Sequence, residues 1–202
     1  MPTIEYFYAA HSAYAYLGSA KLMEIAAESG AEIIHRPMDL RRVVPAAGSI
    51  PTSERTAAHR AYFFGREIQR WSEERGAPVV KGTPTHHYND IALPNCFLIA
   101  AMEAGHNIDR LAHALLEAHW RDDADLANPP TLARLAAGLG LDGESLLAAA
   151  ETPATTGLYE RYTQEAIDRS VFGSPTYFVD GDMFYGQDRL EMVARALRQP
   201  YR

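Results

Sequence analysis

Strand-like segments occur only near the two ends of this chain, and that distribution limits the fold more than any other feature. Near the amino end, "IEYFY" (4–8) and "AEIIHRPM" (31–38) are short apolar runs rich in aromatic and β-branched residues. Near the other end, "TYFVD" (176–180) and "MFYG" (183–186) flank a "DGD" turn. The sequence between them has helical spacing almost throughout. We therefore expect one sheet to combine strands that are distant in the sequence.

The order of elements predicts an α/β protein. A helix over 13–30, closing on Gly30, completes a strand–helix–strand unit, and a helix over 187–199 follows the hairpin. These parts make up a thioredoxin-like domain from residues 1–45 plus 168–202, and an all-helical domain at 46–167 is inserted into it. Residues 41–53 contain prolines and a glycine among small residues and are predicted to form a loop.

Composition excludes several classes of protein. The formal net charge of −7 repels phosphate backbones, and no basic stripe is present, so nucleic acid is not an expected partner. The start of the chain alternates like a strand rather than a signal peptide, and "IALPNCFLIAAM" (91–102) is too short to span a membrane. We expect a cytoplasmic protein. Cys96 is the single cysteine, which excludes a disulfide, a CxxC pair and a cysteine-based zinc site.

Polar side chains occupy an unusual place in "FYAAHSAYAYLG" (7–18), where the first strand gives way to a helix. Taken alone, Ser12 is typical of a helix N-cap. A nucleophilic Ser12 with His11 as its base is disfavoured, because neighbouring residues at a strand end point to opposite faces. His11 is otherwise expected to be a partly exposed turn residue.

Segments along the whole chain carry a resemblance. "YFYAAHSAYAYLG", "RPMDLRRVVPAAGSIP", "REIQRW" and "VFGSPTYFVDGDMFYGQDRL" together resemble the 2-hydroxychromene-2-carboxylate isomerases and kappa-class glutathione transferases, relatives of the DsbA oxidoreductases. The pattern of that family is met most closely in 171–190, at Phe172, Gly173, Pro175, Thr176, Phe184, Gly186, Asp188, Arg189 and Leu190. The resemblance implies a DsbA-like thioredoxin fold with a large helical insertion, and glutathione as cofactor.

For Ser12 the resemblance implies a specific role. The first cysteine of the CxxC pair in DsbA-like proteins lies at the start of this helix, where the helix dipole favours an anionic sulfur. Here Ser12 stands in that place. Its hydroxyl is expected to donate a hydrogen bond to the thiolate of bound glutathione, which makes Ser12 the catalytic residue. Disulfide exchange of the DsbA type is excluded, because the cysteine pair is missing.

Other glutathione contacts follow from the same resemblance. Pro175 matches the cis-proline of the family, and the backbone of Ser174 is expected to pair with the peptide-like middle of glutathione; an ordinary trans proline is the alternative. Gln187 and Asp188 open the final helix, whose N–H groups suit the γ-glutamyl carboxylate, while the Asp188 carboxylate suits the ammonium group. Asp188 can also serve as a helix cap.

The remaining polar contacts concern carboxylates. Arg60 is expected to bind the glycyl carboxylate of glutathione, with a solvated helix arginine as the alternative. Ser49 stands where family members often have asparagine that contacts glutathione. A cation among Arg36, Arg41 and Arg42 is expected to bind a carboxylate of the substrate.

Histidine and acidic clusters elsewhere lack the spacing of a metal site. His86 and His87, His113 and His119, and "DDAD" (122–125) are predicted to be solvated or satisfied polar groups, and no metal is expected. Four aromatic side chains at helical spacing are predicted to be mostly core, with one or two lining an aromatic substrate pocket: Tyr62, Phe63, Phe64 and Trp71.

The implied function is a glutathione-dependent cis–trans isomerase. It interconverts 2-hydroxychromene-2-carboxylate and trans-o-hydroxybenzylidenepyruvate, or a close aromatic analogue, through a reversible adduct of the glutathione thiolate. The substrate is thus a small aromatic keto acid. A kappa-type transferase and a non-catalytic glutathione-binding module are the alternatives. Apolar helices in the inserted block favour a homodimer.

Overall fold

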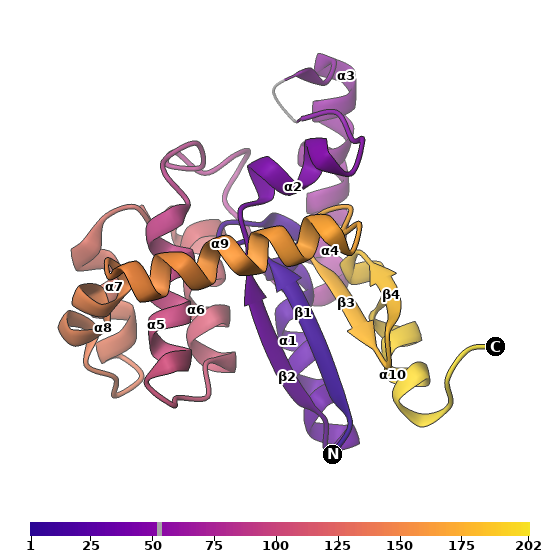
Figure 1. The fold of residues 1–202 in the computed structure, drawn as a ribbon. Coiled ribbons are helices and arrows are strands. Elements are labelled where there is room, and N and C mark those ends of the chain that lie inside the picture. The colour runs from indigo at the N-terminus through magenta and orange to yellow at the C-terminus, as the bar shows by residue number, and fades with distance from the viewer. Residues whose placement is uncertain (52–53) are drawn as a thin grey trace.

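The two ends of the chain form one sheet. A computed structural model describes residues 1–51 and 54–202, so Thr52 and Ser53, which belong to the predicted loop, lie outside the described residues. The sheet has the order β2-β1-β3-β4 (Figure 1). Its strands are β1 (Thr3–Tyr8), β2 (Glu32–Pro37), β3 (Thr176–Val179) and β4 (Asp182–Tyr185). β1 and β2 are parallel, whereas β3 is antiparallel to both β1 and β4. The predicted pairing of distant strands is confirmed.

Helices fill the chain between β2 and β3, as the sequence predicts. α1 (Ala13–Ser29) connects the parallel strands, and Gly30 ends it in the left-handed conformation. After β4 the chain makes one 3₁₀ turn, η3 (Gln187–Arg189), and continues into α10 (Leu190–Arg198). The intervening helices are α2 (Leu40–Ala46), α3 (Ala57–Arg60), the π-helical η2 (Ala61–Arg66), α4 (Glu67–Arg75), α5 (Ala92–Glu103), α6 (Asp109–Asp122), α7 (Pro129–Ala137), α8 (Gly143–Ala150) and α9 (Pro153–Asp168).

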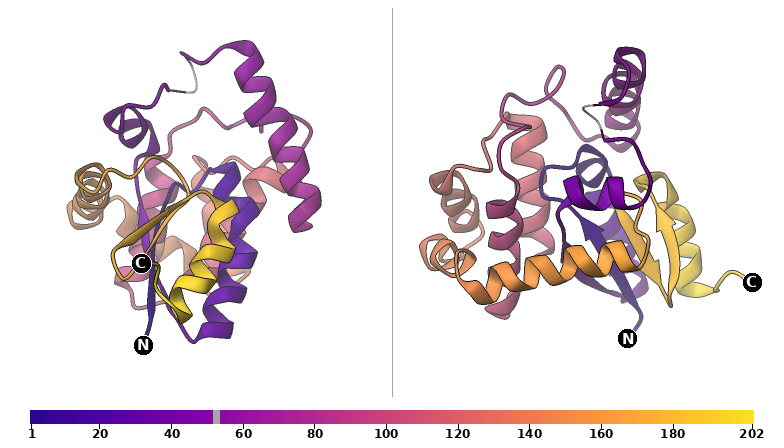
Figure 2. Two further views of the ribbon diagram at one scale, coloured as in Figure 1. Left: turned by 90° about the vertical axis from the view of Figure 1, so that its right-hand side faces the viewer. Right: turned by 45° about the horizontal axis from the view of Figure 1, so that its top comes forward.

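Helices cover both faces of the sheet. Ile4, Tyr6 and Tyr8 of β1 point to the face that α1 and α10 cover and belong to the main hydrophobic core. Phe7 points to the other face and packs in a smaller cluster with Ala166 of α9. The left view of Figure 2 shows α9 on one side of the sheet and α1 with α10 on the other. This alternation is what fixes the register of β1.

The prediction of a loop over 41–53 is wrong for its first part, which is helix α2. The carboxylate of Asp39 caps this helix by accepting from the Arg41 N–H at 2.9 Å, and Val43 is fully buried. Pro45 lies next to the end of the helix, where its missing N–H removes a single terminal hydrogen bond. A good cap and one buried side chain therefore outweigh the proline.

The helical block and the sheet share a continuous core. α6 packs on α1, while α5 and α9 pack on β2. Inside this core the Tyr8 hydroxyl lies 3.0 Å from Nδ1 of His35, and Nε2 of His35 lies 2.9 Å from the carboxylate of Asp109 at the start of α6. The division into 1–45 plus 168–202 and 46–167 stays a prediction. Among residues 1–51 and 54–202, no helix is both long enough and apolar enough to cross a bilayer.

Candidate active site at the start of α1

Ser12 is the N-cap of α1. Its backbone is extended, with φ −73° and ψ 125°, and its hydroxyl oxygen accepts a hydrogen bond from the Ala15 N–H at 3.3 Å. The cap predicted from the sequence is confirmed. The residue is 6% exposed. Ser12 therefore lies at the positive end of a long helix, in a partly desolvated position where a negative charge is stabilised.

Partners from distant elements hold the loop before Ser12. The Ala9 N–H donates to Oγ of Ser174 at 3.1 Å, and the Ala10 N–H donates to Oδ1 of Asn95 at 3.0 Å. The indole N–H of Trp120 donates to the His11 carbonyl at 2.8 Å. Sequence reasoning missed Asn95 and Trp120, since each lies in an apolar helical run. The loop is thus fixed from three sides.

Ser12 and the predicted cis-proline loop lie together. The Ser12 hydroxyl donates to the Ser174 carbonyl at 3.2 Å, and the bond between Ser174 and Pro175 is cis. The Gly186 N–H donates to the Pro175 carbonyl at 2.9 Å, which places the start of η3 beside this loop. The structure therefore gathers Ser12, Ser174, Pro175 and the residues that follow Gly186.

Gln187 and Asp188 differ in what surrounds them. Gln187 is 1% exposed, and its amide oxygen accepts from Nε of Arg75 at 3.0 Å. Asp188 is exposed, with Nη2 of Arg189 3.5 Å away. Gly18 of α1 allows η3 to approach closely, because a Cβ on Gly18 would lie 2.6 Å from Cβ of Gln187. Of these two predicted residues, only Asp188 offers its side chain to a ligand in this structure.

Arg60 and Ser49 lie on the segments that follow β2. Arg60 donates to the Arg55 carbonyl and lines a cavity described below. Ser49 follows α2, and its N–H donates to the Val44 carbonyl at 3.1 Å. α2 and α3 rise above the end of the sheet where β1 and β2 finish (Figure 1). No hydrogen bond within the described ranges joins Arg60 or Ser49 to Ser12.

The three candidate cations for a substrate carboxylate are not equivalent. Arg42 forms a two-pronged ion pair with Glu160, at 2.5 and 2.7 Å. Arg36 lies 3.4 Å from Glu165 on the α9 face. Arg41 instead donates to main-chain carbonyls of the segment between α4 and α5, at 3.1 and 2.7 Å. Arg41 is therefore the member of this group without a carboxylate partner in the part of the chain that the structure describes.

A cluster of imidazoles lies beside the start of α1. The rings of His11 and His87 have centroids 5.0 Å apart, and Nδ1 of His87 lies 3.1 Å from Nε2 of His119. The ring of Trp120 lies edge-on to that of His87, with centroids 5.3 Å apart. The prediction of satisfied polar groups is confirmed for His119, both of whose ring nitrogens have partners, whereas His87 has a partner at Nδ1 alone among the described residues. Their proximity to the Ser12 loop was not foreseen.

Burial keeps these imidazoles neutral. It lowers the pKa of His87 to about 4, and the electrostatic influence of the His119 ring and of the Arg41 guanidinium contributes. His11 is also buried, so the expectation of a partly exposed turn residue is wrong, and burial holds its pKa well below the usual range. Near neutral pH the cluster therefore carries lone pairs rather than positive charge. Within the described residues, no group of three or more metal-ligating side chains is arranged to hold an ion.

A cavity of about 300 Å³ adjoins the imidazole cluster. This size suits a small ligand. Phe64 lines the cavity and Trp71 packs against the core, but Tyr62 and Phe63 are exposed, so the prediction that these aromatic residues are mostly core is wrong for these two. The expectation that one of these aromatic residues lines a pocket is therefore met by Phe64. The other lining residues are Arg60, Ala61, Gly65, Thr83, His87, Tyr88 and Trp120.

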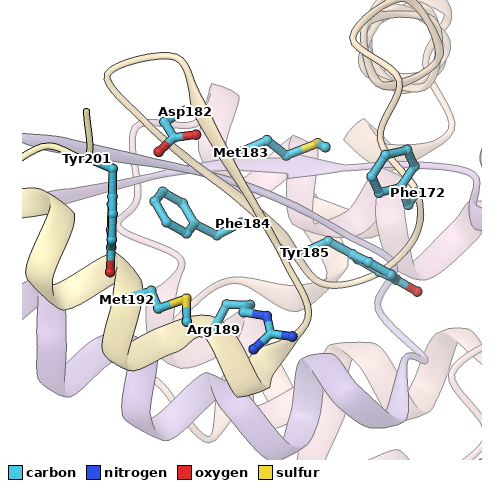
Figure 3. Close-up of a pocket in the computed structure, with 8 residues that line it drawn as sticks. All are labelled: Phe172, Asp182, Met183, Phe184, Tyr185, Arg189, Met192 and Tyr201. Carbon is cyan, nitrogen blue, oxygen red and sulfur yellow. The ribbon is translucent and has the colours of Figure 1, made fainter.

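A second hollow of about 430 Å³ surrounds the edge strand β4. Figure 3 shows Phe184 directed toward Tyr201 and Met192 on one side of the strand, and Tyr185 on the side of Phe172. The ring centroids of Phe172 and Tyr185 are 5.8 Å apart. Neither Ser12 nor Ser174 lines this hollow. The cavity beside His87 is the better candidate for a substrate.

Comparisons with known proteins agree with this architecture. A family model described as a DSBA-like thioredoxin domain matches residues 3–198. A 2-hydroxychromene-2-carboxylate isomerase from Pseudomonas putida is 28% identical over 196 residues, which cover 96% of this chain and 93% of the relative. One from Sphingobium xenophagum is 27% identical over 191 residues, 95% of each chain. A solved structure of a 2-hydroxychromene-2-carboxylate isomerase has a TM-score of 0.78 at 25% identity, covering 98% of this chain and 95% of that chain. The resemblance and the fold class expected from the sequence are confirmed.

Proposed function

The chain belongs to the family of DSBA-like thioredoxin domains, and from that premise we propose that it is an isomerase that uses glutathione. The relatives that match over nearly its whole length are 2-hydroxychromene-2-carboxylate isomerases. The proposed reaction interconverts 2-hydroxychromene-2-carboxylate and trans-o-hydroxybenzylidenepyruvate, or a close aromatic analogue.

One observation carries the proposal: Ser12 stands at the N-terminus of α1 with a hydroxyl group and no thiol. The hydroxyl is a hydrogen-bond donor, now used by the Ser174 carbonyl at 3.2 Å. A thiolate placed here gains that hydrogen bond and the positive end of the helix. Cys96 offers no redox alternative, because it is buried in α5, and burial raises the pKa of its thiol to about 11.

Residues around Ser12 suit the rest of the tripeptide. The backbone at Ser174 lies next to Ser12 and fits an extended peptide. The exposed carboxylate of Asp188, one residue into η3, fits the ammonium of the γ-glutamyl group. In this proposal Arg60 binds the glycyl carboxylate, and Ser49 and Gln187 lie at the margins of the site, with the Gln187 side chain held by Arg75.

Opening of the hemiketal ring of 2-hydroxychromene-2-carboxylate breaks the bond between C2 and the ring oxygen, which gives a phenolic hydroxyl and a ketone conjugated with the double bond. The chemistry that glutathione supplies when bound is a thiolate for reversible addition to that double bond, which leaves a single bond that rotates before elimination restores the alkene and releases the thiolate. Ser12 holds the sulfur in its ionised form by hydrogen bonding. The cavity beside His87 receives the aromatic ring, since Phe64, Tyr88 and Trp120 line it. Of the three candidate cations for the carboxylate of the substrate, Arg41 is the one that binds the segment carrying His87 and has no carboxylate partner among the described residues.

The test measures turnover with glutathione present in catalytic amounts. Conversion of 2-hydroxychromene-2-carboxylate is followed by ultraviolet absorbance while free thiol is titrated. We expect many turnovers per glutathione with no loss of thiol. Stoichiometric loss of thiol would instead indicate a kappa-type transferase.

Ser12→Ala tests the role of the hydroxyl. Losing one hydrogen bond to a charged group should lower turnover by roughly 10–100-fold. Thr152→Ala is the matched control, because Thr152 caps α9 with its side chain in the same way. Both variants lose about 1 kcal/mol of cap stability, but only Ser12→Ala should lose activity. Equal turnover in wild type and both variants would refute the role of the Ser12 hydroxyl, whereas no turnover in any of the three proteins would point to a glutathione-binding module without this catalysis.

A further inference from the structure

Hydrogen bonds define which nitrogen of His87 carries a proton. Nδ1 of His119 lies 3.0 Å from the Ala124 carbonyl, which can only accept, so this nitrogen is protonated. Neutral His119 then presents an acceptor at Nε2. Nδ1 of His87, 3.1 Å away, must therefore be the donor. It follows that Nε2 of neutral His87 carries a lone pair.

The segment that carries His87 is held by side chains from other parts of the chain. Asp123 accepts from both the N–H and the hydroxyl of Thr85, each at 2.6 Å. Asp125 accepts from the side-chain amide of Asn89 at 3.1 Å. Arg41 binds the carbonyls of Tyr88 and Asn89. The acidic run at 122–125 thus holds the loop that places His87.

His87 faces the cavity that the proposed function assigns to the substrate. It lines this cavity together with Phe64, Tyr88 and Trp120. Its Nε2 has no hydrogen-bond partner in the described part of the chain and is not among the atoms sealed from solvent. Trp120 also donates to the His11 carbonyl, next to Ser12, so the cavity adjoins the place of the proposed thiolate.

We propose that His87 is a specificity-determining residue, whose Nε2 accepts a hydrogen bond from the hydroxyl group that the aromatic ring of the substrate carries in its ring-opened form. This inference rests on the proposed function, and it adds the chemical group that is selected. His119 acts as a positioning residue that fixes the tautomer of His87. A site built to accept a hydroxyl hydrogen discriminates strongly against analogues that lack it, because its own polar group is left unpaired.

The lowered pKa of His87 keeps its Nε2 available as a hydrogen-bond acceptor. Burial, with the electrostatic influence of the His119 ring and of Arg41, lowers the pKa of His87 to about 4. The imidazole therefore stays neutral across the range in which an enzyme normally works. A phenolic hydroxyl, with a pKa near 10, remains a donor in the same range.

The kinetic test compares substrates that differ at one group. The kcat/KM for o-hydroxybenzylidenepyruvate is compared with that for its o-methoxy analogue, each added as the open-chain trans isomer and followed as loss of that isomer with glutathione. We expect wild type to prefer the hydroxyl compound by roughly 10²-fold. His87→Phe should abolish most of that preference. His87→Gln keeps a hydrogen-bond acceptor and should retain part of the preference, whereas His119→Phe should weaken the preference. His113→Phe is the control, since His113 lies on α6 but bonds Ser19.

A binding test does not depend on turnover. The probes are o-hydroxycinnamate and o-methoxycinnamate, added to protein labelled with ¹⁵N at histidine. We expect protonated Nδ1 on both His87 and His119, at least tenfold tighter binding of the hydroxyl probe, and a shift of the His87 Nε2 signal with that probe alone. Absence of turnover in wild type with both substrates would overturn the proposed function. Equal affinity for the two probes, or a preference unchanged in His87→Phe, overturns the role of His87.

Discussion

At the scale of single residues, the site depends on side chains that hold a backbone loop. The position of Ser12 was predictable, because a serine directly before a helical segment is a local sequence signal for an N-cap. Asn95 and His87 were not, because their importance comes from partners far away in the sequence, Ala10 and His119. Periodicity places such residues on a helix or loop but does not indicate which distant polar group each one meets.

Asn95 gives the first prediction at this scale. Its side chain is fully buried, accepts from the Ala10 N–H at 3.0 Å and donates to the Ile91 carbonyl at 2.8 Å. Asn95→Ala leaves a buried N–H without an acceptor, so we expect a loss of about 2–4 kcal/mol in the free energy of unfolding. Urea denaturation measures this. Asn107→Ala, which removes an exposed contact to the Asp109 N–H, should cost about 1 kcal/mol or less. Equal losses in the two variants would contradict the role given to Asn95.

At the scale of elements, the site depends on how α1 meets its neighbours. The Tyr14 hydroxyl of α1 donates to the Phe63 carbonyl in η2 at 2.5 Å, and Gly18 faces η3 on another side. Sequence periodicity predicted a helix around Phe63 but not the π-helical turn η2. The Phe63 carbonyl is bound by a side chain of another helix, and such a contact leaves no pattern in the local sequence. Helix α2 was missed for the opposite reason, because prolines and small residues resemble a loop even where a cap and a buried valine stabilise a helix.

Two helical glycines allow a matched test of the contact between α1 and η3. A Cβ on Gly18 would lie 2.6 Å from Cβ of Gln187, whereas one on Gly157 of α9 would meet nothing within 4 Å. Gly18→Ala must push η3 away and should cost about 1–3 kcal/mol, with a raised KM for glutathione because Asp188 moves with η3. Gly157→Ala should stabilise by about 0.5–1 kcal/mol with no change in KM. Thermal denaturation and glutathione titrations check both. A Gly18→Ala protein as stable as wild type would show that η3 packs less closely on α1.

At the scale of the whole molecule, one sheet built from both ends of the chain brings Ser12 beside Ser174. The order of elements at the two ends predicted this sheet. A strand–helix–strand unit at the start and a hairpin followed by a helix at the end can bury their apolar faces by sharing one sheet. The position of the helical block against β2 and α1 could not be predicted, because it depends on tertiary packing. The same holds for the cavity that the block forms beside the imidazoles. The homodimer expected from the apolar block stays a prediction, for which sedimentation velocity is the measurement.

The buried imidazoles should make the stability of the whole molecule depend on pH. An unfolded histidine titrates near pH 6.5, whereas burial, His119 and Arg41 lower the pKa of His87 to about 4 in the folded chain. The unfolded state therefore binds more protons between these values, so the stability present above about pH 6.5 is lost progressively as the pH falls toward 4. The contribution of His87 is about 1–3 kcal/mol. Urea denaturation from pH 4 to 7.5 should show a flatter profile for His87→Phe than for wild type. The control is His106→Phe, which removes an exposed imidazole and should follow the wild-type profile. Parallel profiles for all three proteins would mean that the pKa of His87 is not lowered in the folded state.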